Sequence, residues 1–87
     1  MRVISQDGKL EFEYSDLGLS IIGNSINGFY SKVNDGKSYT LATYDCESDV
    51  AAEIRMLHNT YVKLNSNPGC YQFTSKETYR KSRGEVW

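Results

Sequence analysis

The chain has 87 residues, and its ten Lys and Arg residues against eleven Asp and Glu residues give a formal net charge of −1. A chain of this length forms a single domain, residues 1–87, and buries only about 60–65% of its extended surface, so its stability margin is small. The balanced charge argues against direct nucleic-acid binding, which depends on many contacts to phosphates, and against an acidic mimic of DNA.

The first two predicted elements are strands joined by a tight turn. Residues 2–5 form the first strand, and Asp7-Gly8 supplies a turn in which glycine tolerates positive φ. Residues 9–14 alternate apolar and acidic side chains, which is the period of a half-buried antiparallel strand. The apolar positions are Leu10, Phe12 and Tyr14, and the acidic positions are Glu11 and Glu13.

Further apolar segments follow before this pattern stops. Leu17–Ile22 is the third segment, and residues 23–28, which are rich in Gly and Asn, are expected to form a turn. Residues 29–33 and 38–44 are expected as the fourth and fifth strands, joined by a second Asp-Gly turn within residues 34–37.

One amphipathic helix is predicted over Glu47–Leu64, with Asp45 as its N-cap. Apolar residues recur there at spacings of four, three, four and three, which places them on one helical face: Val50, Ile54, Leu57, Tyr61 and Leu64. Pro68 ends the helix, and residues 70–75 are expected as a last short strand. The tail from about residue 76 is polar and could be flexible.

The predicted fold is therefore α+β, a small antiparallel sheet of about five strands packed on one amphipathic helix. No apolar run reaches the roughly 18 residues of a membrane span, and the opening residues lack the apolar segment of a signal peptide. We expect a cytoplasmic protein without a membrane partner, whose cysteines stay reduced.

Candidate catalytic residues are few. A nucleophile needs a base within hydrogen-bond reach, and His58, the single histidine, falls inside the predicted helix. Neither a phosphate-binding loop nor a dinucleotide glycine pattern nor a nucleophile elbow occurs in the sequence. We therefore expect no enzyme, no catalytic residues and no cofactor other than zinc.

Zinc is left open because Cys46, His58 and Cys70 are all potential ligands. Cys46 is at the start of the predicted helix and His58 lies about 11–12 residues along it, or roughly 17 Å at a rise of about 1.5 Å per residue, so the three cannot share one ion. Cys70 could approach His58 after the turn, and a carboxylate or a second chain would then have to complete the site. Two ordinary small thiols are the alternative.

Partner binding is predicted at two places. The tail groups cations with aromatic residues, a combination that suits phosphates and protein interfaces, and the strand 9–14 presents two carboxylates on one face. The predicted contact residues are Tyr79, Arg80, Lys81, Arg83 and Trp87 in the tail, with Glu11 and Glu13 in the strand. A solvated tail and a solvated acidic face are the simpler interpretations, and a homodimer is also left open.

The opening residues Met1-Arg-Val-Ile-Ser-Gln-Asp-Gly8 resemble the start of short proteins carried by phages and prophages of Firmicute bacteria. In those proteins the hairpin leads to a strand ending in a Leu-Ala-x-Tyr step and then to a capped helix. Leu41-Ala-Thr-Tyr44 stands in that place here, and Tyr71-Gln-Phe73 is similar to their closing strand.

This resemblance implies a counter-defence protein of the host bacterial cell. The favoured function is an anti-CRISPR inhibitor that binds a type II RNA-guided effector nuclease and blocks it sterically. One alternative is an oligomeric sponge that sequesters a cyclic nucleotide-like immune signal, similar to Thoeris anti-defence proteins. A small phage DNA-binding regulator is a further alternative.

Overall fold

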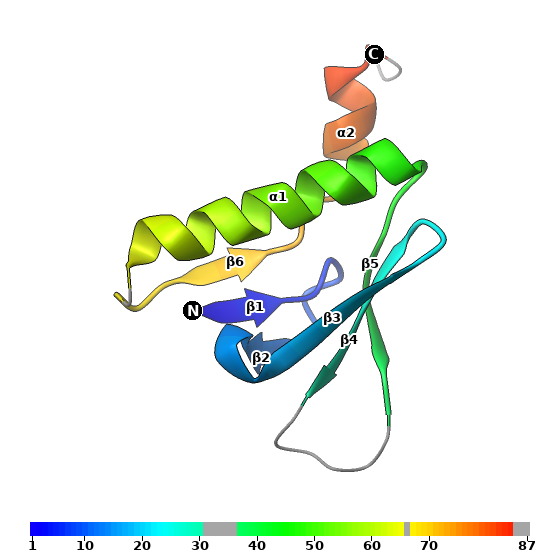
Figure 1. Ribbon diagram of the computed structural model, residues 1–87. Coiled ribbons are helices and arrows are strands. Elements are labelled where there is room, and N and C mark those ends of the chain that lie inside the picture. Colours follow the sequence, from blue (N-terminus) through cyan, green and yellow to red (C-terminus); the bar gives the residue numbers. More distant parts are fainter. Residues whose placement is uncertain (31–36, 66, 85–87) are drawn as a thin grey trace.

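The computed structural model describes residues 1–30, 37–65 and 67–84 (Figure 1). Over these residues it contains two three-stranded sheets, two α-helices and a short 3-10 helix, η1, at Tyr14–Asp16. The α+β class is confirmed, whereas one sheet of about five strands on one helix is only roughly matched. The strands divide into two sheets because β6 joins the first hairpin rather than the strands that precede the helix.

The first sheet has the order β2-β1-β6, formed by Arg2–Ile4 (β1), Glu11–Glu13 (β2) and Cys70–Gln72 (β6). β1 and β2 are antiparallel, and the predicted turn between them is confirmed, with Gly8 at φ 77°. β1 and β6 are parallel. The expectation of a wholly antiparallel sheet is wrong here, because a long helical connection precedes β6 and lets it enter in the same direction as β1.

The second sheet is antiparallel and has the order β3-β4-β5, formed by Leu17–Ile22 (β3), Ser25–Tyr30 (β4) and Tyr39–Thr43 (β5). The predicted turn over residues 23–28 is wrong in length. Only Gly23 and Asn24 connect β3 to β4, because Gly23 at φ 59° closes a two-residue hairpin and residues 25–28 then pair with β3. Residues 31–36, which include most of the second Asp-Gly turn and the end of the predicted fourth strand, lie outside the described residues.

β5, an edge strand of this sheet, carries a bulge near the middle of its length. Ile26 lies opposite Ala42 and Asn27 lies opposite Thr40, so Leu41 has no partner across the strand. A bulge of this kind re-aims side chains. Leu41 and Ala42 are consequently both buried, which adds a leucine to the core.

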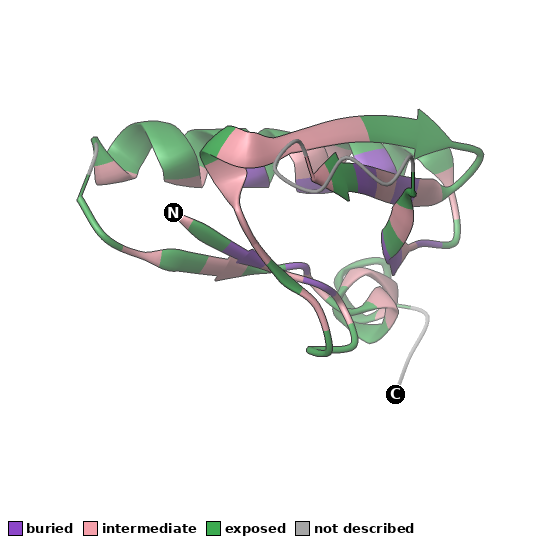
Figure 2. Ribbon diagram, turned by 90° about the horizontal axis from the view of Figure 1, so that it is seen from below, coloured by how far each residue is buried: buried purple, intermediate pink, exposed green. Residues whose placement is uncertain are grey.

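Both sheets and the first helix share one core (Figure 2). Its buried members are Val3, Ile26, Leu41, Ala42, Tyr44, Val50, Leu57 and Phe73. The predicted apolar face of residues 9–14 packs against this core with partly buried side chains, as expected from its alternation.

The first helix, α1, spans Glu47–Leu64, as predicted. Its N-cap is Cys46, which makes no side-chain capping hydrogen bond, so the assignment of Asp45 as N-cap is wrong. Asp45 lies one residue too early to cap, and its carboxylate contacts an arginine of the tail instead. At the other end Asn65 adopts the left-handed conformation at φ 46°, and the helix stops there, before Pro68.

A second helix, α2, spans Lys76–Ser82, in the polar tail to which the sequence assigned no element. Ser75 is its N-cap and accepts a hydrogen bond from the Thr78 backbone N–H at 3.3 Å. None of the helices in the described ranges is long and apolar enough to cross a membrane.

Candidate functional site

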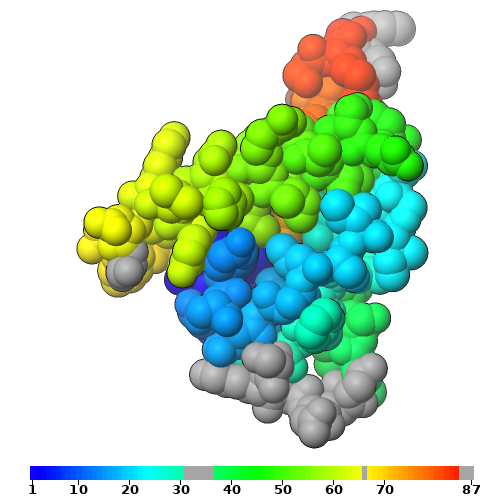
Figure 3. All heavy atoms as spheres, viewed as in Figure 1, coloured from blue at the N-terminus to red at the C-terminus, as the bar shows by residue number. Residues whose placement is uncertain are grey.

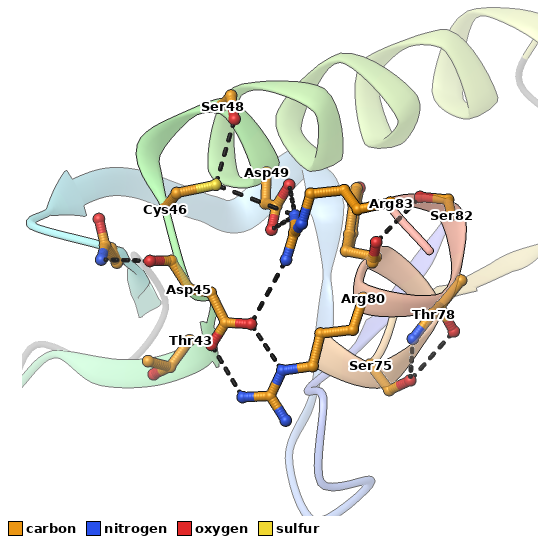
Figure 4. Close-up of polar contacts among 12 residues, drawn as sticks. Thr43, Asp45, Cys46, Ser48, Asp49, Ser75, Thr78, Arg80, Ser82 and Arg83 are labelled. Carbon is orange, nitrogen blue, oxygen red and sulfur yellow. Dashed lines mark hydrogen bonds and ion pairs between the residues drawn. The ribbon is translucent and has the colours of Figure 1, made fainter. Parts of the chain in front are cut away.

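The arginines of the tail hold α2 against the start of α1 (Figure 4). The Arg80 guanidinium donates to both carboxylate oxygens of Asp45, at 2.7 and 2.9 Å, and Arg83 Nη1 donates to Asp49 at 2.7 Å. Arg83 Nη2 also lies 3.5 Å from Asp45. The hydrogen bond from Arg80 lowers the pKa of Asp45. We call Asp45, Asp49, Arg80 and Arg83 the arginine cluster.

A buried carboxylate lies behind the arginine cluster. Glu53 of α1 is fully buried, and its oxygens accept hydrogen bonds at 2.7 Å from the hydroxyls of Tyr71 and Tyr79 and from the backbone N–H of Thr74. The Tyr44 hydroxyl donates to the Thr74 carbonyl at 2.7 Å. We call Glu53, Tyr44, Tyr71 and Tyr79 the tyrosine cluster. Burial raises the pKa of each of these three tyrosines well above its ordinary value, and the charge of Glu53 adds to the effect.

Most of the tail residues predicted to contact a partner take part in these two clusters. Tyr79, Arg80 and Arg83 all bond to α1 or to the segment just before it, whereas Lys81 is exposed on α2. Trp87 lies outside the described residues. Contact between the tail and a partner stays a prediction, and three of its residues have a structural role in addition.

The predicted acidic pair is also engaged within the domain. Glu11 accepts a hydrogen bond from Arg2 Nε at 2.9 Å, and Glu13 lies 3.0 Å from the amino group of Met1. The first of these pairs is exposed on both sides, so it contributes little to stability. The pair lies on β2, away from the residues of the tail.

The three potential zinc ligands do not come together. Cys46 Sγ lies 3.1 Å from Ser48 Oγ at the start of α1, His58 is exposed on α1, and Cys70 is exposed on β6. Within the part of the chain that the structure describes, no three His, Cys, Asp or Glu side chains group as a metal site requires.

Gln6 joins the two sheets, and sequence reasoning assigned it no role. Its backbone N–H donates to the Leu41 carbonyl at 2.8 Å, next to the bulge in β5. Its side-chain amide accepts from the Thr43 N–H and donates to the Thr43 carbonyl, both at 3.1 Å, and also donates to the Thr74 carbonyl at 3.0 Å. A single side chain thus occupies the edge of β5 as a neighbouring strand would.

Two shallow hollows are lined by residues that the structure describes. One, of about 180 Å³, lies between Met1, Glu13 and Tyr61, and the other, of about 270 Å³, lies between Gln6 and β5. Neither of these two hollows has the volume of a typical small-molecule site, which is roughly 300–1,000 Å³.

The second sheet presents apolar side chains to solvent. Strand pairing places Phe29 and Ile22 on the side opposite to the buried Ile26, which we call the outer face, and they are 52% and 62% exposed. The Phe29 ring lies across Gly18, where an added Cβ would come within 2.3 Å of it. Ser20 and Thr40 are exposed on the same face. Figure 3 shows β3 and β4, in blue to cyan, at the surface beside α1.

Two signals in the sequence could have located these features. Leu17–Ile22 contains no charged residue, which is unusual for a strand with one side in water. Glu53 falls three residues after Val50 and four before Leu57, within the apolar stripe of the helix, so its burial follows from that spacing. For Gln6, a polar residue in a turn, no comparable signal exists.

The chain matches no known family model, and neither a curated protein nor a solved structure is significantly similar to it. The lineage expected from the opening residues therefore stays a prediction.

Proposed function

We propose that this protein acts by binding another protein through the outer face of the second sheet. The observation that carries the proposal is the exposure of Phe29 and Ile22 on one sheet face, where the small polar residues Ser20 and Thr40 lie between them. A surface that mixes exposed large apolar side chains with small polar ones suits protein binding. The partner that the resemblance implies is a type II RNA-guided nuclease, and the inhibition is steric.

The rest of the domain supplies a rigid support for this face. The tyrosine cluster and Gln6 fix the core side of the molecule through hydrogen bonds between elements distant in sequence. A partner that covers about 800 Å² takes roughly a seventh of the 5631 Å² surface.

The sponge alternative asks for a pocket of arginine and aromatic residues. Arg80 and Arg83 contact Asp45 and Asp49, and Tyr79 contacts Glu53, so these residues are engaged within the domain. We therefore keep the protein-binding function as the single proposal.

The test compares two lysine substitutions at matched exposure. Ile22→Lys changes the outer face at a residue that is 62% exposed, and Val62→Lys changes α1 at a residue that is 60% exposed. Each purified variant is titrated into a DNA-cleavage assay with a type II effector, alongside a direct binding measurement. We expect Ile22→Lys to weaken inhibition at least about tenfold, because a charge is then desolvated at the contact. Val62→Lys should leave it unchanged.

Two results would contradict the proposal. If the unmodified protein neither binds nor inhibits type II effectors, the partner is wrong. If it inhibits and Ile22→Lys inhibits equally well, the outer face is wrong.

A further inference from the structure

The two sheets have four outer edges, and three of them are short or covered. β2 and β6 have three residues each, and β2 carries Glu11 and Glu13. The edge of β5 is occupied by Gln6. β3 differs from all of these, since it has six residues, none of them charged. Natural proteins usually protect exposed edges with charges, proline or a covering segment.

The backbone of β3 is also arranged for pairing. In a two-residue hairpin the residues flanking the turn, here Ile22 and Ser25, form a hydrogen-bonded pair, and such pairs alternate along the strands. Leu19 and Ile21 therefore direct their N–H and C=O groups away from β4. Among the described residues, the backbone hydrogen bonds formed outside helices and strand ladders do not involve these two. In Figure 2, β3 lies at the margin of the molecule and becomes exposed toward its end.

We propose that β3 pairs antiparallel with β3 of a second copy of this chain, with the two-fold axis at Ser20. An axis perpendicular to the sheet keeps the same face of both copies on the same side. Leu19 then lies opposite Ile21 of the second copy, and both residues have free hydrogen-bonding groups. Gly18 lies opposite Ile22, which brings that isoleucine beside the Phe29 ring that covers Gly18.

The charge of β3 and the area that the pairing would bury are both consistent with a second copy of this chain as the partner. A strand that pairs with itself places like residues close together, and the six neutral residues of β3 bring no like charges into contact. If each copy covers about a tenth of its 5631 Å² surface, the interface slightly exceeds the roughly 1,000 Å² that specific contacts need. The dimer should therefore dissociate on dilution. The proposal rests on the backbone edge of β3 and not on the proposed function, although the pairing brings Ile22 and Phe29 of the outer face together across the two copies.

The test uses the fact that only a residue on the axis lies opposite itself. Sedimentation velocity over a range of concentrations should show a dimer for the unmodified chain. Ser20→Lys and Ser20→Glu should each raise the dissociation constant at least about tenfold, because two like charges then face each other. An equimolar mixture of the two variants should recover the dimer. Thr40→Lys is the matched control, since it adds the same charge to an exposed residue of β5.

The outcomes separate the two proposals. A chain that stays monomeric at all concentrations overturns the β3 dimer and leaves inhibition of the nuclease untouched. A dimer that Ser20→Lys does not weaken, or a mixture of the Ser20 variants that does not recover it, also overturns this pairing. Because Ser20 also lies on the outer face, the Ser20 variants report on self-association alone, and inhibition is judged from the unmodified chain and from Ile22→Lys.

Discussion

Two neighbouring regions at one end of the second sheet use their side chains in opposite ways, although Asn24 of the β3–β4 hairpin bonds directly to Tyr44 and Asp45 before α1. Near the start of α1, the arginine and tyrosine clusters pair charged and polar groups drawn from α1, α2 and the segment after β6. At the β3–β4 hairpin, isoleucines and a phenylalanine end in solvent, and the strand edge has free backbone groups. The first region uses its polar groups internally, so it is built for stability. The second leaves apolar groups unused by the core, so it is the better candidate for binding.

The largest loss of folding stability is expected when the buried carboxylate of Glu53 is removed. Glu53→Ala leaves two tyrosine hydroxyls and the Thr74 N–H without their acceptor in the interior. We expect the free energy of unfolding to fall by about 3–5 kcal/mol, which could abolish folding in so small a domain. Urea unfolding followed by circular dichroism measures the change, with Glu47→Ala on the exposed first turn of α1 as the control. Equal losses in the two variants would show that the tyrosine cluster has no special role.

A smaller loss is expected at Gln6. Gln6→Ala removes the three side-chain hydrogen bonds that join β5 to the segment after β6. At about 1 kcal/mol for each partly buried hydrogen bond, stability should fall by about 2–3 kcal/mol. Gln72→Ala is the matched control, because that exposed amide makes one long contact of 3.5 Å. A Gln6 variant as stable as the Gln72 variant would contradict the role of Gln6 between the sheets.

The smallest effect is expected at the arginine cluster, and it depends on pH. Because Arg80 lowers the pKa of Asp45, the pair stabilises the folded state above about pH 4, and this contribution is lost as the pH falls below that value. Arg80→Ala should raise the pKa of Asp45 toward its ordinary value. An NMR titration of the Asp45 carboxyl measures the shift, and Lys81→Ala serves as the control on an exposed neighbour. An unchanged pKa would remove Arg80 as the cause.

The sequence predicted what depends on local periodicity and turn chemistry. The bounds of α1, the hairpin at Gly8 and the apolar face of residues 9–14 follow from side chains a few positions apart. The features that the sequence did not predict depend on contacts between segments that are distant in the chain. The parallel entry of β6 beside β1 and the position of Gln6 on β5 have no local signature.

For the candidate site too, the sequence indicated the residue types but not the contacts that they make. Residue types that suit binding, such as Arg80 and Tyr79, were found by composition, but their contacts with Asp45 and Glu53 appear only when α2 meets α1. The sequence shows that β3 and β4 are rich in apolar residues. It does not show that one face of these strands is exposed, because a run of uncharged residues is equally typical of a buried strand.

The parallel pairing of β1 with β6 has a consequence for how the domain folds. Residues 2–4 hydrogen-bond with residues 70–72, and Gln6 reaches Thr74, so the first sheet closes a loop that contains nearly the whole chain. Contacts this distant in sequence slow folding, because the entropy of closing the loop is lost before the contacts form. The β3–β4 hairpin and α1 can form locally and early. The rate of folding should then be set by the meeting of the two distant segments, and stopped-flow refolding of Gln6→Ala, which weakens that meeting, would measure it.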